Sequence, residues 1–294
     1  LLSARATNSE PTDMALKVSV VIVTFYREQF LRRTLWSCLG KRDVDFANVE
    51  VIVVDGSPNA SARGVVEEIE EEGRQLGLTV RFLHEPRPGI SHSRNAGVRA
   101  AASDLVAFID DDEVPDPGWL DHLLLVMHDT GAGVVTGPVL PAFEADVPEW
   151  IRRGRFFDRE RHDTGTFQDR AVTGNVLLRT ALLDDMPAPF DERKPLSGGT
   201  DTHLFRKLIT DGHRIVWADE AIVHEFNPST RLTGSWLVRR AYRVSSNWSS
   251  TERELEPGMR VGARRFAKAL FRIGQGVALF PVGLVAGRHV LVRA

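Results

Sequence analysis

The stretch Leu105-Val106-Ala107-Phe108-Ile109-Asp110-Asp111-Asp112-Glu113 joins five apolar residues to four consecutive acidic ones. Its apolar part predicts a strand that is buried on both faces of a sheet. Four adjacent carboxylates repel one another. A divalent cation among them would reduce that repulsion, because Mg²⁺ and Mn²⁺ prefer carboxylate oxygens and also bridge to phosphate. The alternative is an acidic turn that caps the following helix. The stretch therefore predicts a buried strand with either a cation site or a helix cap at its end.

Strand-like and helix-like patterns alternate through the first half of the chain. The strand-like runs are mostly continuous in apolar character, which predicts strands that are covered on both faces. Their alternation with helices predicts right-handed βαβ units and an α/β fold, with a mainly parallel central sheet flanked by helices. The expected strands are 18–23, 49–54, 79–83, 104–109 and 134–135, and the expected helices are 27–39, 60–75, 91–102 and 119–128.

Polar side chains follow three of the expected strands. Thr24 and Tyr26 come after the first strand, Asp55 after the second, and the run 110–112 after the fourth. Because ligands of parallel sheets bind beyond the carboxyl ends of the strands, these groups are expected around one crevice. The turn after the first strand carries neither a glycine fingerprint for dinucleotides nor a Walker-type loop. A bound nucleotide would therefore be held by side chains and a metal.

The composition limits the class of protein. The chain has 294 residues, 43% of them hydrophobic and 26% charged, which fits one large globular domain or one domain with an appendage. The net charge of −3 gives no general attraction to nucleic acid. The single cysteine, Cys38, has no internal disulfide partner and favours a reducing, cytoplasmic compartment. Residues 1–16 lack the apolar core of a signal peptide and are predicted to be a disordered leader.

The last segment, 251–294, is predicted to be a basic, apolar C-terminal extension with helical structure. It carries no acidic residue after Met259, and its uncharged stretch 273–287 has 15 residues, which is short for a membrane span. Such a tail can lie on an anionic membrane surface, which would make the protein peripheral on the inner face of the membrane. The alternative is a helix that docks on the domain, or on a second subunit in a homo-oligomer. Its basic residues are Arg260, Arg264, Arg265, Lys268, Arg272, Arg288 and Arg293.

Four motifs resemble those of family 2 glycosyltransferases, which have the GT-A fold. They occur in the family's order, and the resemblance extends over 18–243, most of the chain. The second motif has one aspartate fewer than the family's usual Val-Val-Asp-Asp-Gly-Ser. The motifs are Val20-Val21-Ile22-Val23-Thr24-Phe25-Tyr26-Arg27, Val53-Val54-Asp55-Gly56-Ser57, Pro88-Gly89-Ile90-Ser91-His92-Ser93-Arg94-Asn95-Ala96-Gly97 and Phe108-Ile109-Asp110-Asp111-Asp112.

The resemblance implies a GT-A catalytic domain over 17–250, with a nucleotide-binding half at 17–137 and an acceptor and catalytic half at 138–250. It implies an inverting enzyme that moves a sugar from a nucleotide-diphosphate donor, expected to be a UDP-sugar, to an acceptor hydroxyl. The acceptor would be a glycan, a lipid-linked sugar or a small molecule. The cofactor would be a divalent cation, Mn²⁺ or Mg²⁺, and no nucleic acid is expected as a partner.

The first three motifs imply a site for the nucleotide. Thr24 and Asp55 would hold the base, with Tyr26 stacking or hydrogen bonding nearby. Arg27 belongs to the same donor loop, and Arg94 would lie near the base or the phosphates. Each of these residue types also has a structural alternative, such as a strand-end hydroxyl, a turn aspartate, a core aromatic ring or a surface arginine.

The acid run implies the metal site. By resemblance, Asp112 would bind the cation that bridges the diphosphate, and Asp110 would contact the ribose. Asp111 belongs to the same donor-binding set, although alternation along an extended segment would direct its side chain away from both neighbours.

The second half of the chain contains the expected catalytic base. The regular pattern is lost between Pro138 and Arg170, which favours a long acceptor loop or lid. Asn175 then resembles the asparagine of a Gly-Asn strand beside the donor sugar, with a bulge or turn as the alternative. Asp201 stands where the family has its catalytic aspartate, and Thr200 stands where glutamate is usual. The alternative role for Asp201 is a helix cap.

Two later residues resemble groups that bind the metal and the phosphates. His224 follows an apolar run, at a place where GT-A enzymes often complete the metal shell, and its alternative is a packed loop histidine. Arg231 would clamp the diphosphate. The arginines of the helix that follows fit either an active-site helix or the polar face of an amphipathic helix.

Two other functions stay open at this point. A sugar-phosphate nucleotidylyltransferase has a related sheet and a metal, but it normally uses a glycine-rich loop and a lysine after the first strand, and neither is present. A non-catalytic nucleotide- or glycan-binding module could keep the same fold. The presence of both Asp112 and Asp201 favours a transferase, because transfer needs a base for the acceptor hydroxyl and a cation for the leaving group.

Overall fold

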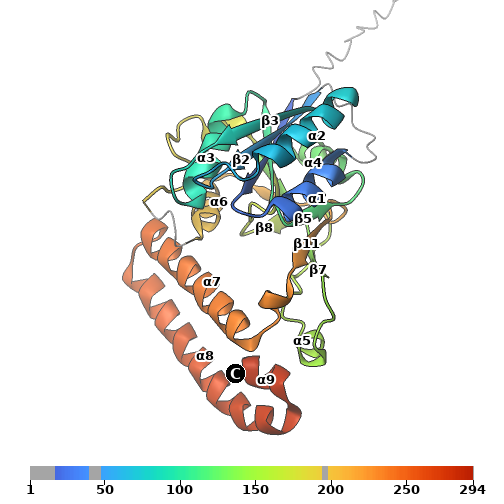
Figure 1. The fold of residues 1–294 in the computed structure, drawn as a ribbon. Coiled ribbons are helices and arrows are strands. Elements are labelled where there is room, and N and C mark those ends of the chain that lie inside the picture. Colours follow the sequence, from blue (N-terminus) through green and yellow to red (C-terminus); the bar gives the residue numbers. More distant parts are fainter. Residues whose placement is uncertain (1–16, 40–47, 194–197, 294) are drawn as a thin grey trace, which may run out of the picture.

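The structure, a computed structural model, describes residues 17–39, 48–193 and 198–293, so the predicted leader lies outside the described residues. Its strands are β1 (Val18–Thr24), β2 (Val49–Asp55), β3 (Thr79–His84), β4 (Leu105–Ile109), β5 (Glu113–Pro115), β6 (Val134–Thr136), β7 (Val139–Phe143), β8 (Phe167–Gln168), β9 (Asn175–Arg179), β10 (Ile215–Trp217) and β11 (Val223–Asn227). Eight strands form one sheet in the order β3-β2-β1-β4-β9-β6-β10-β8, and the order β5-β11-β7 forms a smaller one (Figure 1). The prediction of an α/β fold with a mainly parallel central sheet is confirmed.

The central strands are buried on both faces, as their continuous apolar runs predict. Val20 and Ile22 point into one core layer, while Val21 between them points into the other, because successive side chains of a strand face opposite sides. The first layer is covered by α1 (Glu28–Leu39), α2 (Arg63–Gln75) and α4 (Trp119–Thr130). The second is covered by α3 (Ile90–Ala100) and α6 (Thr200–Thr210).

The parallel pairing brings the polar strand ends to one edge of the sheet. β1 lies between β2 and β4, with Thr24 opposite Asp55 and Val21 opposite Phe108. β4 therefore ends at Ile109, and the acid run begins beside the last residues of β1. On the far side of β4, β9 runs antiparallel to both β4 and β6. It connects the nucleotide-binding half that the sequence predicts with the second half.

The small sheet lies directly after the acid run. β11 pairs antiparallel with β5, which places Glu225 opposite Glu113, and parallel with β7 on its other side. Its connections include α5 (Glu149–Gly154) and the short 3₁₀ helix η3 (Ser229–Arg231), while a second one, η2 (Thr180–Leu183), follows β9. β11 and η3 therefore place Glu225 and Arg231 beside the end of the acid run.

Three helices form the C-terminal part, namely α7 (Gly234–Leu255), α8 (Met259–Ala286) and α9 (Arg288–Arg293). The long helices α7 and α8 run side by side below the sheets (Figure 1). Glu252 of α7 accepts hydrogen bonds from Arg264 at 3.3 Å and from Arg265 at 2.9 Å. At the other end of α8, the Arg288 guanidinium of α9 lies 4.6 Å from the ring centre of Trp150 in α5. Both ends of α8 are thus attached to the same body of the protein.

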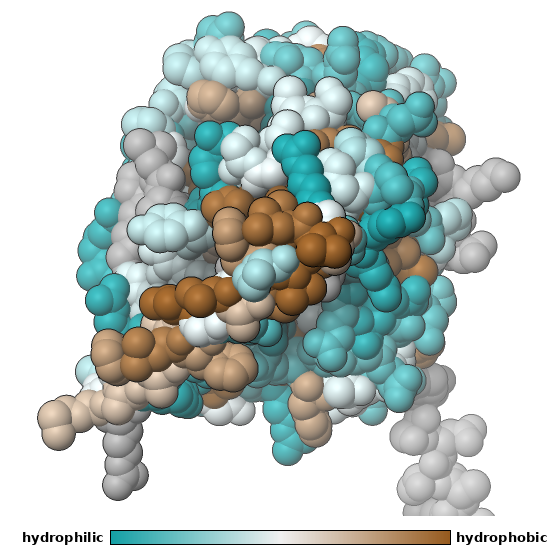
Figure 2. Space-filling view, turned by 90° about the horizontal axis from the view of Figure 1, so that it is seen from below, coloured by the Kyte–Doolittle hydropathy of each residue, from teal (hydrophilic) through white to brown (hydrophobic). Residues whose placement is uncertain are grey.

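Helix α8 exposes apolar side chains along most of its length. Its stretch Val261–Ala286 is long and apolar enough to cross a membrane, judged by length and composition, and 6% of the apolar window within it is buried. Figure 2 shows apolar side chains gathered at the end of the molecule where α8 lies. The exposed large apolar residues of α8 are Met259, Phe266, Leu270, Phe271, Ile273, Val277, Phe280, Val282, Leu284 and Val285.

Candidate active site

A cavity of about 680 Å³, called the main cavity below, opens at the carboxyl ends of β1 and β4. Its size lies within the range of roughly 300–1,000 Å³ that is usual for small-molecule sites. Asp110 and Asp111 line it from the end of β4, and Asp201 lines it from the first turn of α6. Groups that are about 90 residues apart in the sequence therefore face the same space. The other predicted site residues in its lining are Thr24, Arg27 and Arg94.

The acid run turns immediately after Asp110. The backbone N–H of Glu113 donates to the Asp110 carbonyl at 3.1 Å, and the Thr34 hydroxyl contacts the carbonyls of Asp111 and Glu113 at 2.8 and 2.7 Å. Alternation along an extended segment does not apply inside a turn. The expectation that Asp111 points away from both neighbours is therefore wrong: one nitrogen of Arg27 contacts the carboxylates of Asp111 and Asp112, and Asp111 belongs to the lining of the main cavity.

Two arginines neutralise the acid run. Asp111 accepts hydrogen bonds from the Thr24 hydroxyl at 2.8 Å and from Arg27 at 2.9 Å. Asp112 is buried beside it, and its Oδ2 accepts from Arg27 at 3.1 Å and from Arg231 at 2.8 Å. Two guanidinium groups therefore converge on one oxygen of Asp112. This arrangement shows that the position attracts positive charge.

Asp110 and Glu113 hold protons more tightly than ordinary carboxyl groups. Burial at the cavity floor raises the pKa of Asp110 to about 7, although 46% of its side-chain surface stays accessible and Arg94, 3.8 Å away, opposes the rise. Burial also raises the pKa of Glu113 well above its ordinary value, and the Asp110 carboxylate adds to this. A Cβ atom at Gly174 would overlap the Glu113 carboxylate, so the glycine leaves room for that carboxylate in its present position. A cation would replace these protons.

Asp201 is positioned by a glycine pair. Gly198 and Gly199 have positive φ angles of 72° and 77°, which favour glycine, and they turn the chain into α6. A Cβ atom at Gly199 would overlap the Asn247 side chain, so the glycine also lets α7 approach the start of α6. The Asp201 Oδ1 accepts the backbone N–H of Thr202 at 2.8 Å. This contact holds the carboxylate at the cavity wall.

The side chains of Asp55 and Asn175 are buried and hydrogen-bonded to groups of the protein interior. The two carboxylate oxygens of Asp55 accept the backbone N–H groups of Ser57 and Ala62, each at 2.8 Å, which is the turn role. The Asn175 amide donates to the Pro138 and Ala221 carbonyls at 3.0 and 2.6 Å, and its oxygen accepts from the Trp119 indole at 2.7 Å. These contacts use the Asn175 donors and its acceptor, so the structure does not bring Asn175 to the cavity.

Tyr26 lies at the cavity rim in a strained conformation. Its φ of 52° is left-handed, which costs energy for a residue with a side chain. Its exposed ring packs edge-on against Phe25 at 4.8 Å, and Phe25 lines the main cavity. The turn therefore presents an aromatic pair, of which Phe25 is the member in the wall.

The structure does not bring His224 to the acid run, which corrects its expected role as a metal ligand. Its Nε2 lies 3.0 Å from the carboxylate of Asp116. The next residue of β11, Glu225, is the one that contacts Arg231, at 3.1 Å, and through it Asp112. Because neighbours on a strand face opposite sides, His224 points away from this cluster. Glu225 is one functional candidate that the sequence reasoning missed.

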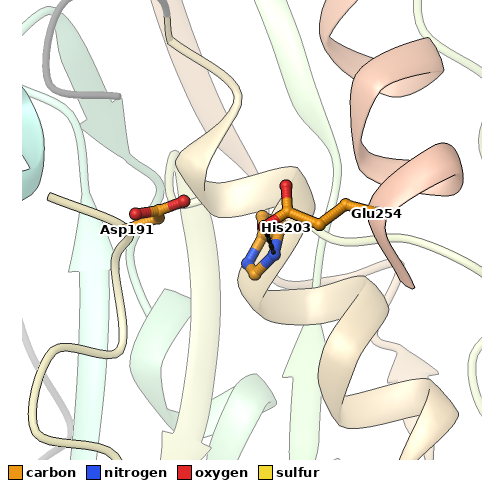
Figure 3. Close-up of side chains that lie close together, drawn as sticks. All are labelled: Asp191, His203 and Glu254. Atoms are coloured by element: carbon orange, nitrogen blue, oxygen red, sulfur yellow. Dashed lines mark ion pairs between the residues drawn. The ribbon is translucent and has the colours of Figure 1, made fainter. Parts of the chain in front are cut away.

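A second acidic group resembles a metal site. Potential ligand atoms of Asp191, His203 and Glu254 lie within 4.8 Å of one another (Figure 3). However, Arg193 donates to Asp191 at 2.8 Å and to Glu254 at 2.7 Å. A guanidinium therefore pairs with this group, just as Arg27 and Arg231 pair with Asp112, so the ligand types decide between the two places. This group ties the end of α7 to α6, and the oxygen-rich acid run fits Mn²⁺ or Mg²⁺ better.

Helix α7 supplies residues that the sequence reasoning left without a definite role. Arg243, Asn247 and Trp248 line the main cavity opposite the strand ends. Arg243 carries positive charge at a cavity that contains three predicted aspartates. Its position within an arginine-rich amphipathic helix was the available signal.

Comparisons with known proteins identify the family of this chain. The family model described as "Glycosyl transferase family 2" matches residues 19–185. The succinoglycan biosynthesis protein ExoM of Rhizobium meliloti is 31% identical over 284 residues, covering 94% of this chain and 89% of that protein.

Two solved structures have a similar fold. The mannosyltransferase PcManGT of Pyrobaculum calidifontis, solved with GDP-Man and Mn²⁺, has a TM-score of 0.62 at 18% identity and covers 97% of this chain and 89% of its own. A fragment of S. aureus TarS, solved with UDP-GlcNAc, has a TM-score of 0.56 at 17% identity and covers 83% and 77%. The family model and the long match to ExoM show that the chain belongs to glycosyl transferase family 2 and is a glycosyltransferase.

Proposed function

We propose that the protein transfers a sugar from a nucleotide-diphosphate donor, a UDP-sugar, to an acceptor hydroxyl by a single inverting displacement. The observation that carries this proposal is that Asp110, Asp111 and Asp201 line one cavity. The bound UDP-GlcNAc and GDP-Man of the two structural neighbours support a nucleotide-sugar donor.

The donor would lie along the strand ends. Its base would reach the rim between Phe25, Gly56 and Ser93, which line the main cavity. Its diphosphate would face Arg27 and Arg94, whose guanidinium groups suit phosphate oxygens. Thr24 and Asp111 would act on the donor as a hydrogen-bonded pair.

The residues present fit a divalent cation at the acid run. Asp110 and Asp112 offer hard oxygen ligands, and burial raises the pKa of Asp110 to about 7, so a bound cation would favour its ionised form. When bound, Mn²⁺ or Mg²⁺ supplies charge stabilisation for the departing diphosphate. Arg27 and Arg231, which converge on Asp112, would be free to turn to the phosphates once that oxygen has another partner.

Asp201 would act as the base. A sugar hydroxyl is a poor nucleophile until its proton is removed, and a carboxylate within hydrogen-bond reach accepts that proton in the transition state. The hydroxyl oxygen then bonds to the anomeric carbon as the bond from this carbon to the phosphate oxygen breaks. The nucleoside diphosphate leaves from the opposite face. One displacement inverts the anomeric configuration, so no second carboxylate is needed as a nucleophile.

Metal removal tests this proposal. We expect the purified protein to release UDP from a UDP-sugar in Mn²⁺, at least about tenfold more slowly in EDTA, and again at the first rate when Mn²⁺ is added in excess. Released UDP is measured directly, with GDP-mannose as a donor control. An undiminished rate in EDTA would exclude the metal role. Formation of a nucleoside triphosphate from a sugar phosphate would favour a nucleotidylyltransferase, and binding without release would favour a non-catalytic module.

We also propose that the protein is peripheral on the cytoplasmic face of a membrane, with α8 lying in the surface. A helix that exposes apolar side chains over most of its surface is unfavourable in water unless another apolar surface covers it. Lys268 and Arg272 add positive charge that suits anionic headgroups. Because Glu252 and Trp150 attach the two ends of α8 to the same body, an in-plane position fits better than a span.

Vesicle binding tests the role of α8. We expect the full chain to co-sediment with phosphatidylglycerol-containing vesicles, and we expect Val285→Asp to weaken this binding by about tenfold or more, because each buried apolar side chain contributes roughly 1.5–3 kcal/mol. Val285 is 92% exposed. Leu125→Asp is the matched control, because Leu125 is 56% exposed on α4. Equal sedimentation of both variants, or a dimer that hides α8 from vesicles, would contradict the membrane role.

A further inference from the structure

A second cavity of about 380 Å³, called the side cavity below, lies next to the main cavity. It is enclosed by the turn between β6 and β7, by β10, and by the long segment before β9 that lacks a regular pattern. Long irregular segments of this kind are often functional. The polar and aromatic residues in its lining are Thr136, Arg159, Glu160, His162, Gln168, Arg170 and Trp217.

The two cavities are neighbours at one residue. Val172 lines both of them. In addition, the guanidinium of Arg170, in the side cavity, lies 5.8 Å from the ring centre of Trp248, in the main cavity. The side cavity therefore adjoins the space that Asp201 faces.

The arginines of the side cavity already have acidic partners. Arg159 donates to Glu225 at 2.8 Å, and Arg170 donates to Asp169 at 3.0 Å. Their charges are thus largely balanced, and what they still offer is planar hydrogen-bonding groups. A phosphate or carboxylate would need an excess of positive charge, whereas neutral hydroxyls need donors and acceptors at fixed angles.

The remaining lining also suits a sugar. The His162 ring packs edge-on against Trp217, with ring centres 5.3 Å apart, and the Trp217 indole N–H donates to Asp219 at 3.0 Å. These contacts hold the two rings rigidly. Rigid aromatic rings offer an apolar surface for the C–H groups of a sugar, while Gln168 and Glu160 offer an amide and a carboxylate for its hydroxyls.

We propose that the side cavity binds a neutral sugar unit of the acceptor glycan, whose reacting hydroxyl extends past Val172 to Asp201. This proposal rests on the glycosyl transfer proposed above. It assigns the acceptor to a neutral, hydroxyl-rich glycan and places its recognition on the segment 159–172.

Arg170 is the cleanest position for a test. Arg159 is unsuitable, because Glu225 links it to Arg231 and Asp112. Arg170 instead pairs with its neighbour Asp169 on the surface. The matched control is Arg153, which is similarly exposed on α5, pairs with Glu149 and lies outside the lining.

The experiment measures glycan binding directly. The protein, with UDP and Mn²⁺, is applied to an array of short neutral, sulfated and uronic-acid oligosaccharides, and the best neutral ligand is then titrated. We expect Arg170→Ala to weaken this binding by about tenfold or more, because a hydrogen bond from a charged donor is lost. We expect Arg153→Ala to bind like the wild type. Matching thermal unfolding of the two variants shows that both are folded.

Three outcomes overturn the proposal: binding to anionic glycans alone, no retention of any neutral glycan, or equal affinity of Arg170→Ala and Arg153→Ala. UDP release by the wild-type protein is measured in parallel. If no UDP is released but neutral glycans bind and Arg170→Ala weakens that binding, the proposed glycosyl transfer is wrong, and the side cavity is still a glycan-binding site. If UDP is released but no neutral glycan is retained on the array, the side cavity is not the acceptor site, and the proposed glycosyl transfer is unaffected.

Discussion

Asp201→Asn is expected to abolish transfer while leaving donor binding almost unchanged. Asparagine keeps the Oδ1 acceptor for the Thr202 N–H, so the start of α6 should stay intact. It cannot accept the acceptor's proton, and the loss of a general base lowers rates by roughly 10²–10⁴-fold. The measurement is transfer with a labelled donor, together with calorimetric titration of UDP in Mn²⁺.

The control for this substitution lies at the other end of the same helix. Asp211 follows α6 and pairs with Lys207 on the surface, 2.6 Å away. Asp211→Asn should therefore transfer at the wild-type rate. Full transfer by Asp201→Asn would remove the base assignment. A helix-cap role does not apply, because the N-cap position of α6 is Gly199, so a loss of UDP binding would show that the substitution disturbs the donor site itself.

The fold was predictable because the relevant signals are local. Val18–Thr24 and Val49–Asp55 are apolar apart from one polar residue near the start and one at the end of each, and such runs favour strands that are covered on both faces. Their polar ends then had to meet, since parallel strands end at one edge. The cavity between Asp110 and Asp201 follows from that rule and from the family resemblance together.

The roles of Asp55 and Asn175 could not be read from the sequence alone. Each side chain is satisfied by groups whose positions depend on tertiary structure. The Asn175 amide is bonded to carbonyls of Pro138 and Ala221, which are distant from it in the sequence. A buried amide needs its hydrogen bonds satisfied, and this need explains the asparagine without a ligand.

The position of His224 depended on strand register. A shift of one residue in a strand moves every side chain to the other face. The observed register pairs Glu225 with Glu113 and turns His224 toward Asp116. Hydrophobic patterning could not fix this, because β11 carries polar residues on both faces. Phe25 and Trp248 were missed for a related reason, as an aromatic residue in a cavity wall looks like core in a sequence.

Asp112→Asn is expected to remove the metal dependence of donor binding, which is the second large effect. The substitution deletes a charged oxygen ligand, and we expect the Mn²⁺-dependent affinity for UDP to fall by at least about a hundredfold. It also leaves Arg27 and Arg231 without their shared charge partner. Thermal unfolding must therefore confirm that the variant is folded. The readout is titration of UDP with and without Mn²⁺.

The pH dependence and a second variant separate the two acidic clusters. A carboxyl group whose pKa is raised by folding contributes full stability below its unfolded value near 4, and that contribution is lost as the pH rises through about 7 for Asp110. Mn²⁺ should offset this loss, so it should raise the unfolding temperature more at pH 8 than at pH 6. His203→Gln should keep this stabilisation and Asp112→Asn should lose it. If His203→Gln loses the stabilisation by Mn²⁺ and Asp112→Asn keeps it, the cation binds at Asp191, His203 and Glu254 and displaces Arg193 from them.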